Sequence, residues 1–131
     1  MIFISFVRRN HWRILLFLLV TALTVIATWP LITNLSSSVY GYSGDSFGHI
    51  YYLWWWRRSF FEHFSISFLP LQQAPFGAFV PKDPGTIVFL WPSYFLLFLF
   101  NEVVVYNLLL LASFLFSAIF AYHFFKQITK S

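Results

Sequence analysis

Asp45 is the residue whose type and position best suit acid–base chemistry. It is the only acid between the first apolar run and Glu62, and it lies in a Gly/Ser-rich segment, residues 41–46, just before an aromatic stretch. An ionised carboxylate at such a place can take a proton from a substrate hydroxyl as a general base. It can equally cap a helix that begins there, because Asp oxygens accept hydrogen bonds from first-turn amides. The residue types favour the cap, and the two roles are compatible.

His49, Arg57 and Arg58 are the neighbouring side chains that could bind a substrate. His49 follows Asp45 by four residues, so a helix would place both on one face. That spacing suits a divalent ion, but the next candidate ligand, Glu62, is far along the chain, and we expect neither a metal nor a cofactor. Adjacent arginines can hold a lipid phosphate through forked hydrogen bonds. Ordinary anchoring at a membrane surface is the commoner use of such a pair.

The composition predicts an integral membrane protein. Of 131 residues, 60% are hydrophobic and only 9% are charged, whereas soluble domains average about 25% charged residues. The formal charge of +4 is gathered in clusters beside apolar runs, which is typical of membrane–water interfaces, so we expect membrane lipids and no nucleic acid as partners. The chain has no cysteine, which excludes disulfides and thiolate chemistry.

Three apolar runs predict an all-α protein with three transmembrane helices, at about residues 14–33, 85–101 and 103–125. The first run has no charge from residue 14 to 35, which at a rise of about 1.5 Å per residue crosses a hydrocarbon core of roughly 30 Å. It is also longer than the apolar core of a cleaved signal peptide, the alternative for this run. We place a tight turn at Asn101 and Glu102 and expect Pro92 to kink the second span.

An amphipathic surface helix is predicted at about residues 46–64, within a long outer loop. The segment has three consecutive tryptophans followed by Arg57 and Arg58. An arginine at the bilayer centre costs roughly 2.5–3.5 kcal/mol, so two adjacent ones argue against a span. Tryptophan beside arginine instead suits the headgroup region. The prolines and glycines at residues 70–85 then predict an irregular extended stretch.

Charge sets the expected orientation. Arginines at positions 8, 9 and 13 precede the first span and predict a cytoplasmic N-terminus. Three spans then place loop 34–85 outside the cell membrane, the 101–102 turn inside and the C-terminal lysines outside. The placement of these lysines, Lys126 and Lys130, runs against the positive-inside rule.

The order of several short elements resembles the N-terminal region of GT-C superfamily glycosyltransferases, in a poorly characterised bacterial and archaeal branch. The matching elements are Gly44-Asp45, Leu53-Trp54-Trp55, Pro75-Phe76-Gly77, Tyr106-Asn107-Leu108-Leu109 and Tyr122. The resemblance covers nearly the whole chain, and it implies a membrane enzyme that takes a sugar from a polyprenyl-phosphate carrier on the outer face. In that superfamily an acid in the first outer loop acts as base toward the acceptor, and Asp45 is the residue that matches.

Members of that superfamily carry many further spans, in which the donor-binding elements lie. The resemblance therefore implies that residues 1–131 are a single membrane domain, the N-terminal part of a larger GT-C-like fold, inactive until a split partner supplies further transmembrane segments. The alternative is a small non-enzymatic membrane subunit that packs through a small-residue stripe on the last span, Ser113, Ser117 and Ala121. A transporter fragment is the weakest reading, because no ionisable residue lies inside any predicted span.

Overall fold

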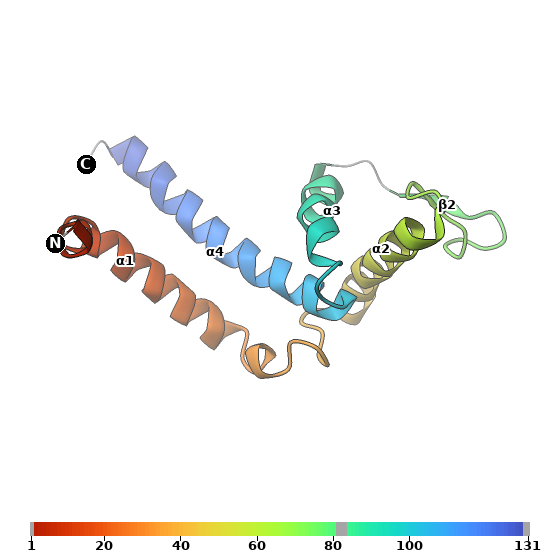
Figure 1. Cartoon of the computed structure of the whole chain (residues 1–131), viewed down its shortest axis with the longest axis horizontal. Coiled ribbons are helices and arrows are strands. Elements are labelled where there is room, and N and C mark those ends of the chain that lie inside the picture. The colour runs from red at the N-terminus through yellow and green to blue at the C-terminus, as the bar shows by residue number, and fades with distance from the viewer. Residues whose placement is uncertain (1, 81–83, 130–131) are drawn as a thin grey trace. The chain divides into compact units, whose positions relative to one another are not determined.

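The structure, a computed structural model, describes the backbone of residues 2–80 and 84–129, and side chains from residue 11 onward except at 81–87, 90 and 130–131. It is mostly helical, with 68% of residues in helices. The elements in chain order are α1 (Ile2–Ala27), a 3-10 helix (Leu31–Thr33), α2 (Ser43–Glu62), β1 (Phe68–Leu69), β2 (Ala78–Phe79), α3 (Pro84–Leu96) and α4 (Glu102–Thr129) (Figure 1).

The chain divides into two compact units. One contains Met1–Thr33 with Leu110–Ser131, and the other contains Asn34–Leu109. The first unit therefore holds α1 and the C-terminal part of α4, and the second holds α2, the β-hairpin, α3 and the start of α4. The predicted site residues Asp45, His49, Arg57 and Arg58 all belong to the second unit.

Among the described residues, α4 is the one helix long and apolar enough to cross a membrane. Its 28 residues correspond to about 42 Å. The Asn101 Oδ1 atom accepts a hydrogen bond from the Val104 amide at 2.9 Å, so Asn101 caps the helix. Glu102 in the first turn and Lys126 in the last both complement the helix dipole. The predicted turn before residue 103 is confirmed, although the helix extends beyond the predicted end at 125.

The first predicted span, 14–33, is helical only in part. Helix α1 begins at Ile2 and ends at Ala27, and the chain then turns into the 3-10 helix. Pro30 explains the early end, because proline lacks an amide proton and disfavours helical geometry in the residue before it. The apolar helical stretch with described side chains, His11–Ala27, is shorter than a full span.

The second predicted span, 85–101, is too short to cross a bilayer as a helix. Helix α3 has 13 residues, or about 20 Å, against a hydrocarbon core of roughly 30 Å. The chain leaves the helix after Leu96, whose carbonyl accepts hydrogen bonds from the amides of Leu99 and Phe100 at 3.0 and 2.9 Å. Three transmembrane helices are therefore not what the structure shows.

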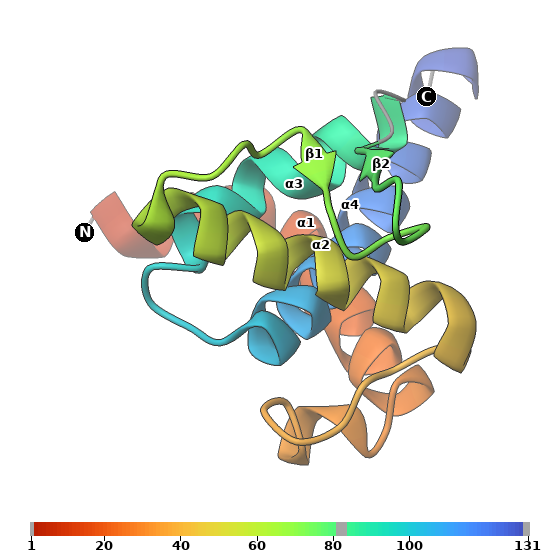
Figure 2. The same cartoon turned by 90° about the vertical axis from the view of Figure 1, so that its right-hand side faces the viewer.

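Helix α2 lies at the centre of the second unit, packed against α3 (Figure 2). Its Leu53 is completely buried and forms a cluster with Leu97, Val105 and Tyr106. Elsewhere on α2, Trp55 stacks on Phe64 at 5.8 Å between ring centroids. The predicted helix is thus confirmed, with bounds 43–62 in place of 46–64. Trp55 is only 6% exposed, so it does not face the headgroups as we expected for all three tryptophans.

The stretch predicted to be irregular contains a short antiparallel hairpin, β1 paired with β2 (Figure 2). Phe68 pairs with Phe79, and their rings meet edge to face at 5.4 Å. Gly77 has φ +74°, and a Cβ at this position would overlap the Phe68 ring. The hairpin therefore needs glycine at this position. Because glycine is typical of turns, its presence beside the short strands favoured the prediction of an irregular stretch.

Candidate functional site

Asp45 lies in the first turn of α2, with its side chain exposed. The helix is capped at Tyr42, which makes no side-chain cap hydrogen bond, so the predicted capping role of Asp45 is wrong. The helix dipole still stabilises a negative charge at this position. Glu62 and Glu102 form ion pairs, whereas Asp45 has no hydrogen-bond or ion-pair partner within the described part of the chain. Among the described residues, the Asp45 carboxylate is therefore both exposed and unpaired.

The segment that carries Asp45 is fixed to α4 by Tyr106. The Tyr106 hydroxyl donates to the Tyr40 carbonyl at 3.1 Å and lies 3.0 Å from Ser46 Oγ. Ser46 Oγ in turn lies 3.3 Å from the same carbonyl. Tyr106 is only 6% exposed, and this small network is shielded from water. The residues on both sides of Asp45 are thereby held in one place.

Asn107, the next residue of α4, holds the preceding loop. Its Nδ2 group donates to the carbonyl oxygens of Leu35 and Ser38, at 2.9 and 2.7 Å. Asn107 is completely buried. The positioning role of Tyr106 and Asn107 was not predicted from the sequence. A signal did exist, since an asparagine inside an apolar helix must find hydrogen-bond partners.

Gly41 allows the loop to approach this network closely. It has φ +118°, and a Cβ on it would lie 2.5 Å from Ser46 Oγ and 3.5 Å from Tyr106 Oη. A distance of 2.5 Å to Ser46 Oγ is shorter than van der Waals contact allows. A non-glycine residue with this φ is also strained, whatever atoms surround it. Glycine at 41 is therefore needed for the network that positions Asp45.

Gly41→Ala is expected to lower the free energy of unfolding by roughly 1–3 kcal/mol, the cost of such a backbone conformation in a non-glycine residue. Gly48→Ala is the matched control, because a Cβ on Gly48 meets no atom within 4 Å. Alanine is also the better helix former inside α2, by about 1 kcal/mol. Thermal unfolding in detergent should place Gly41→Ala below the wild type and Gly48→Ala at or above it. Equal midpoints for both variants would refute the steric account.

His49 lies one turn after Asp45 on α2, as predicted, but its ring is occupied in packing. It contacts Phe89 at 5.0 Å and stacks on Tyr106 at 6.4 Å between ring centroids. Within the described residues, no group of three or more His, Cys, Asp or Glu could hold a metal ion. His49 therefore supports the start of α2 by ring contacts.

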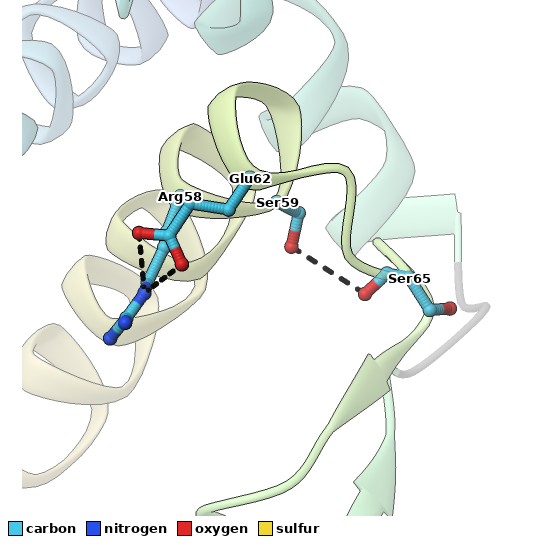
Figure 3. Close-up of polar contacts among 4 residues, drawn as sticks. All are labelled: Arg58, Ser59, Glu62 and Ser65. Atoms are coloured by element: carbon cyan, nitrogen blue, oxygen red, sulfur yellow. Dashed lines mark hydrogen bonds and ion pairs between the residues drawn. The ribbon is translucent and has the colours of Figure 1, made fainter.

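Arg57 and Arg58 lie near the other end of α2, and both are paired with acids. Arg57 Nη1 is 3.4 Å from Glu102 Oε1. Arg58 Nε is 2.9 Å from both carboxylate oxygens of Glu62, one helical turn on (Figure 3). The Arg58 guanidinium also lies 5.4 Å from the centroid of the Trp54 ring. Any phosphate at this place therefore meets arginines whose charge is already balanced.

The predicted site residues thus fall into two separate places. Arg57 follows Asp45 by twelve positions in α2, which is about 18 Å along the helix axis. The phosphate and the anomeric carbon of a sugar donor are joined through one oxygen atom. At this separation the arginines are poorly placed to bind the donor phosphate of a reaction in which Asp45 is the base.

The Arg57–Glu102 pair also bears on the predicted topology. That topology put loop 34–85 outside and the 101–102 turn inside. Two atoms 3.4 Å apart cannot lie on opposite sides of a hydrocarbon core of roughly 30 Å. The end of α2 is therefore in contact with the beginning of α4, and a topology that separates them by a bilayer does not accommodate this contact.

The chain matches no protein-family model, no curated protein and no solved structure. The resemblance to GT-C glycosyltransferases therefore stays a prediction from the order of the sequence elements.

Proposed function

We propose that the chain crosses the membrane twice, through α1 with its following 3-10 helix and through α4. Residues 34–101 then lie together on the outer face, and the Arg57–Glu102 pair and the short α3 support this arrangement. An even number of spans also places both basic ends, arginines 8, 9 and 13 and lysines 126 and 130, in the cytoplasm. The two ends then follow the positive-inside rule, which three spans violated at the C-terminal lysines, while Arg57 and Arg58 lie outside in both arrangements.

We further propose that the outer unit presents Asp45 as the general base of a GT-C-type glycosyl transfer, with a polyprenyl-phosphate sugar as donor. The observation that carries this proposal is the exposed carboxylate in the first turn of α2, which has no partner among the described residues. The loop that bears it is held by Tyr106 and Asn107. A positioned carboxylate within hydrogen-bond reach of a hydroxyl is the geometry that base catalysis requires.

In the proposed reaction, Asp45 takes the proton of the acceptor hydroxyl while that oxygen bonds to the anomeric carbon of the sugar. The bond from this carbon to the phosphate oxygen breaks, and polyprenyl phosphate leaves with the electron pair. Developing charge on the phosphate needs cationic groups or hydrogen-bond donors close by. Arg57 and Arg58 are too far from Asp45 to supply them. Further transmembrane segments of a partner would complete the site.

The experiment is a transfer assay on membranes that contain the chain with its native partners, with a labelled polyprenyl-phosphate sugar as donor. Label should reach a hydroxyl acceptor with the wild-type chain and fail to do so with Asp45→Asn. If membranes that lack the chain transferred the sugar at the same rate, the proposal would be overturned.

A second candidate function is that of a non-enzymatic membrane subunit. Ser113, Ser117 and Ala121 are all exposed on α4, where small residues let another helix approach closely. In this case Ser117→Phe should abolish co-purification of a membrane partner. Loss of the partner with this variant, together with full transfer by Asp45→Asn, would favour the subunit over the enzyme.

A further inference from the structure

The C-terminal part of α2 borders a hollow of mixed charge. Its volume is about 350 Å³, and it is lined by Trp54, Arg57, Arg58, Phe61, Glu62 and Glu102. Among the described residues that line it, two arginines and two glutamates balance to a net charge of zero. Three of these four charged side chains remain about two-fifths exposed, and Glu102 is 19% exposed. The hollow thus offers cationic and anionic groups side by side, on a wall of aromatic rings.

Neither ion pair uses up the hydrogen-bonding capacity of its members. Arg57 uses only Nη1, in a long contact of 3.4 Å with Glu102, and Arg58 uses only Nε, in its pair with Glu62. A guanidinium has five N–H donors, so most donors of both arginines remain available. Each carboxylate likewise has lone pairs left for an ammonium group. A ligand can bind here without breaking either pair.

A second, aromatic hollow adjoins the charged one. Its volume is about 620 Å³, and Phe61 lines both. Trp56, Phe60 and Tyr94 are among its other lining residues. The Phe60 ring meets Tyr94 and Phe98 edge to face, at 5.6 and 4.9 Å. A ligand with a charged head and an apolar tail would therefore find a complementary surface for each part.

The position of the charged hollow fits the membrane interface. Glu102 is the first residue of α4, the candidate membrane-spanning helix. If α4 crosses the bilayer, as the proposed function has it, the hollow lies at headgroup level on the outer face. Charge complementarity then decides the occupant. An anion without a cation, such as polyprenyl phosphate, meets two carboxylates here, whereas a headgroup with both charges pairs with all four side chains.

We propose that this hollow binds a zwitterionic phospholipid with an ammonium headgroup. The lipid phosphate accepts hydrogen bonds from Arg57 and Arg58, and the ammonium group lies between Glu62 and Glu102 with the Trp54 ring close by. The acyl chains leave along Phe61 into the aromatic hollow. The site is separate from Asp45, which lies about 18 Å away along α2.

The test is lipid retention by the whole chain in detergent, measured by native mass spectrometry. Phosphatidylethanolamine, phosphatidylglycerol and diacylglycerol of identical acyl chains are added in turn. The wild type should retain phosphatidylethanolamine at least about tenfold more tightly than either of the others. Retention is measured without sugar transfer, so its failure leaves the assignment of Asp45 untouched.

Two variants distinguish a specific lipid site from non-specific adhesion of lipid to the protein. Glu102→Gln leaves the hollow with one excess positive charge, so its preference should reverse toward phosphatidylglycerol. Arg57→Gln leaves one excess negative charge and should weaken retention of both phospholipids by about tenfold. Lys126→Gln, at the other end of α4, is the control and should behave as the wild type. Equal retention of the two phospholipids by the wild type, or an unchanged preference in Glu102→Gln, would overturn the proposal.

Discussion

Replacing Asp45 with asparagine is expected to lower sugar transfer by about 10²-fold or more, the usual contribution of general acid–base catalysis. Asparagine keeps the size of the side chain but does not accept a proton from the acceptor hydroxyl. Asp45 caps no helix and pairs with no described residue. The substitution should therefore leave membrane insertion and the thermal midpoint nearly unchanged. Transfer rates on matched amounts of membrane-inserted protein provide the measurement.

Ser43→Ala is the matched control for that experiment. Ser43 is exposed in the same first turn of α2, and its replacement removes a polar group without changing charge. Transfer by this variant should stay within about twofold of the wild type, since no catalytic interaction is lost. Full transfer by Asp45→Asn would show that another group is the base. A loss of stability comparable with the loss of rate would assign Asp45 a structural role.

Asn107→Asp is expected to destabilise the protein strongly, by roughly 3–5 kcal/mol, the range found when a buried charge lacks its partner. The Nδ2 group of Asn107 donates to two carbonyl oxygens. Aspartate would turn an acceptor-only group toward those same oxygens, in a place closed to water. The loop before α2 should detach. Thermal unfolding in detergent, together with protease sensitivity between residues 35 and 46, measures both effects.

Asn101→Asp is the matched control, because Asn101 accepts a hydrogen bond whereas Asn107 donates two. Asn101 accepts a hydrogen bond through Oδ1 at the beginning of α4. Aspartate caps helices about as well as asparagine, so the thermal midpoint should change little. If both substitutions destabilised equally, the donor role of Asn107 would be wrong, and the loss would come from added negative charge in general.

The sequence predicted the helices better than it predicted their relation to a membrane. Apolar runs and the Asn101-Glu102 pair located α4, and the aromatic segment located α2 within a few residues of its bounds. Helix α3 was misjudged because its apolar run continues past Leu96, where the helix ends. Hydropathy reports the solvent that a segment prefers, but it does not report where the backbone turns.

The prediction of the candidate site was weaker, because it depended on pairs far apart in the sequence. Asp45 was identified from its isolation, yet its role as a cap depended on a helix boundary that was three residues off. The Arg57–Glu102 contact joins residues 45 positions apart, and local patterns carry no information about it. This single pair joins two elements that the predicted three spans had placed on opposite sides of the membrane.

The most direct test of this account is the side of the membrane on which the C-terminal end of α4 lies. The chain has no cysteine, so single cysteines can be labelled from outside intact cells with a membrane-impermeant maleimide. His11→Cys should be protected and Gln73→Cys labelled under either topology. Gln127→Cys discriminates between them. We predict that it is labelled only after permeabilisation, because two spans return the chain to the cytoplasm. Labelling of Gln127→Cys in intact cells would contradict the account and restore an odd number of spans.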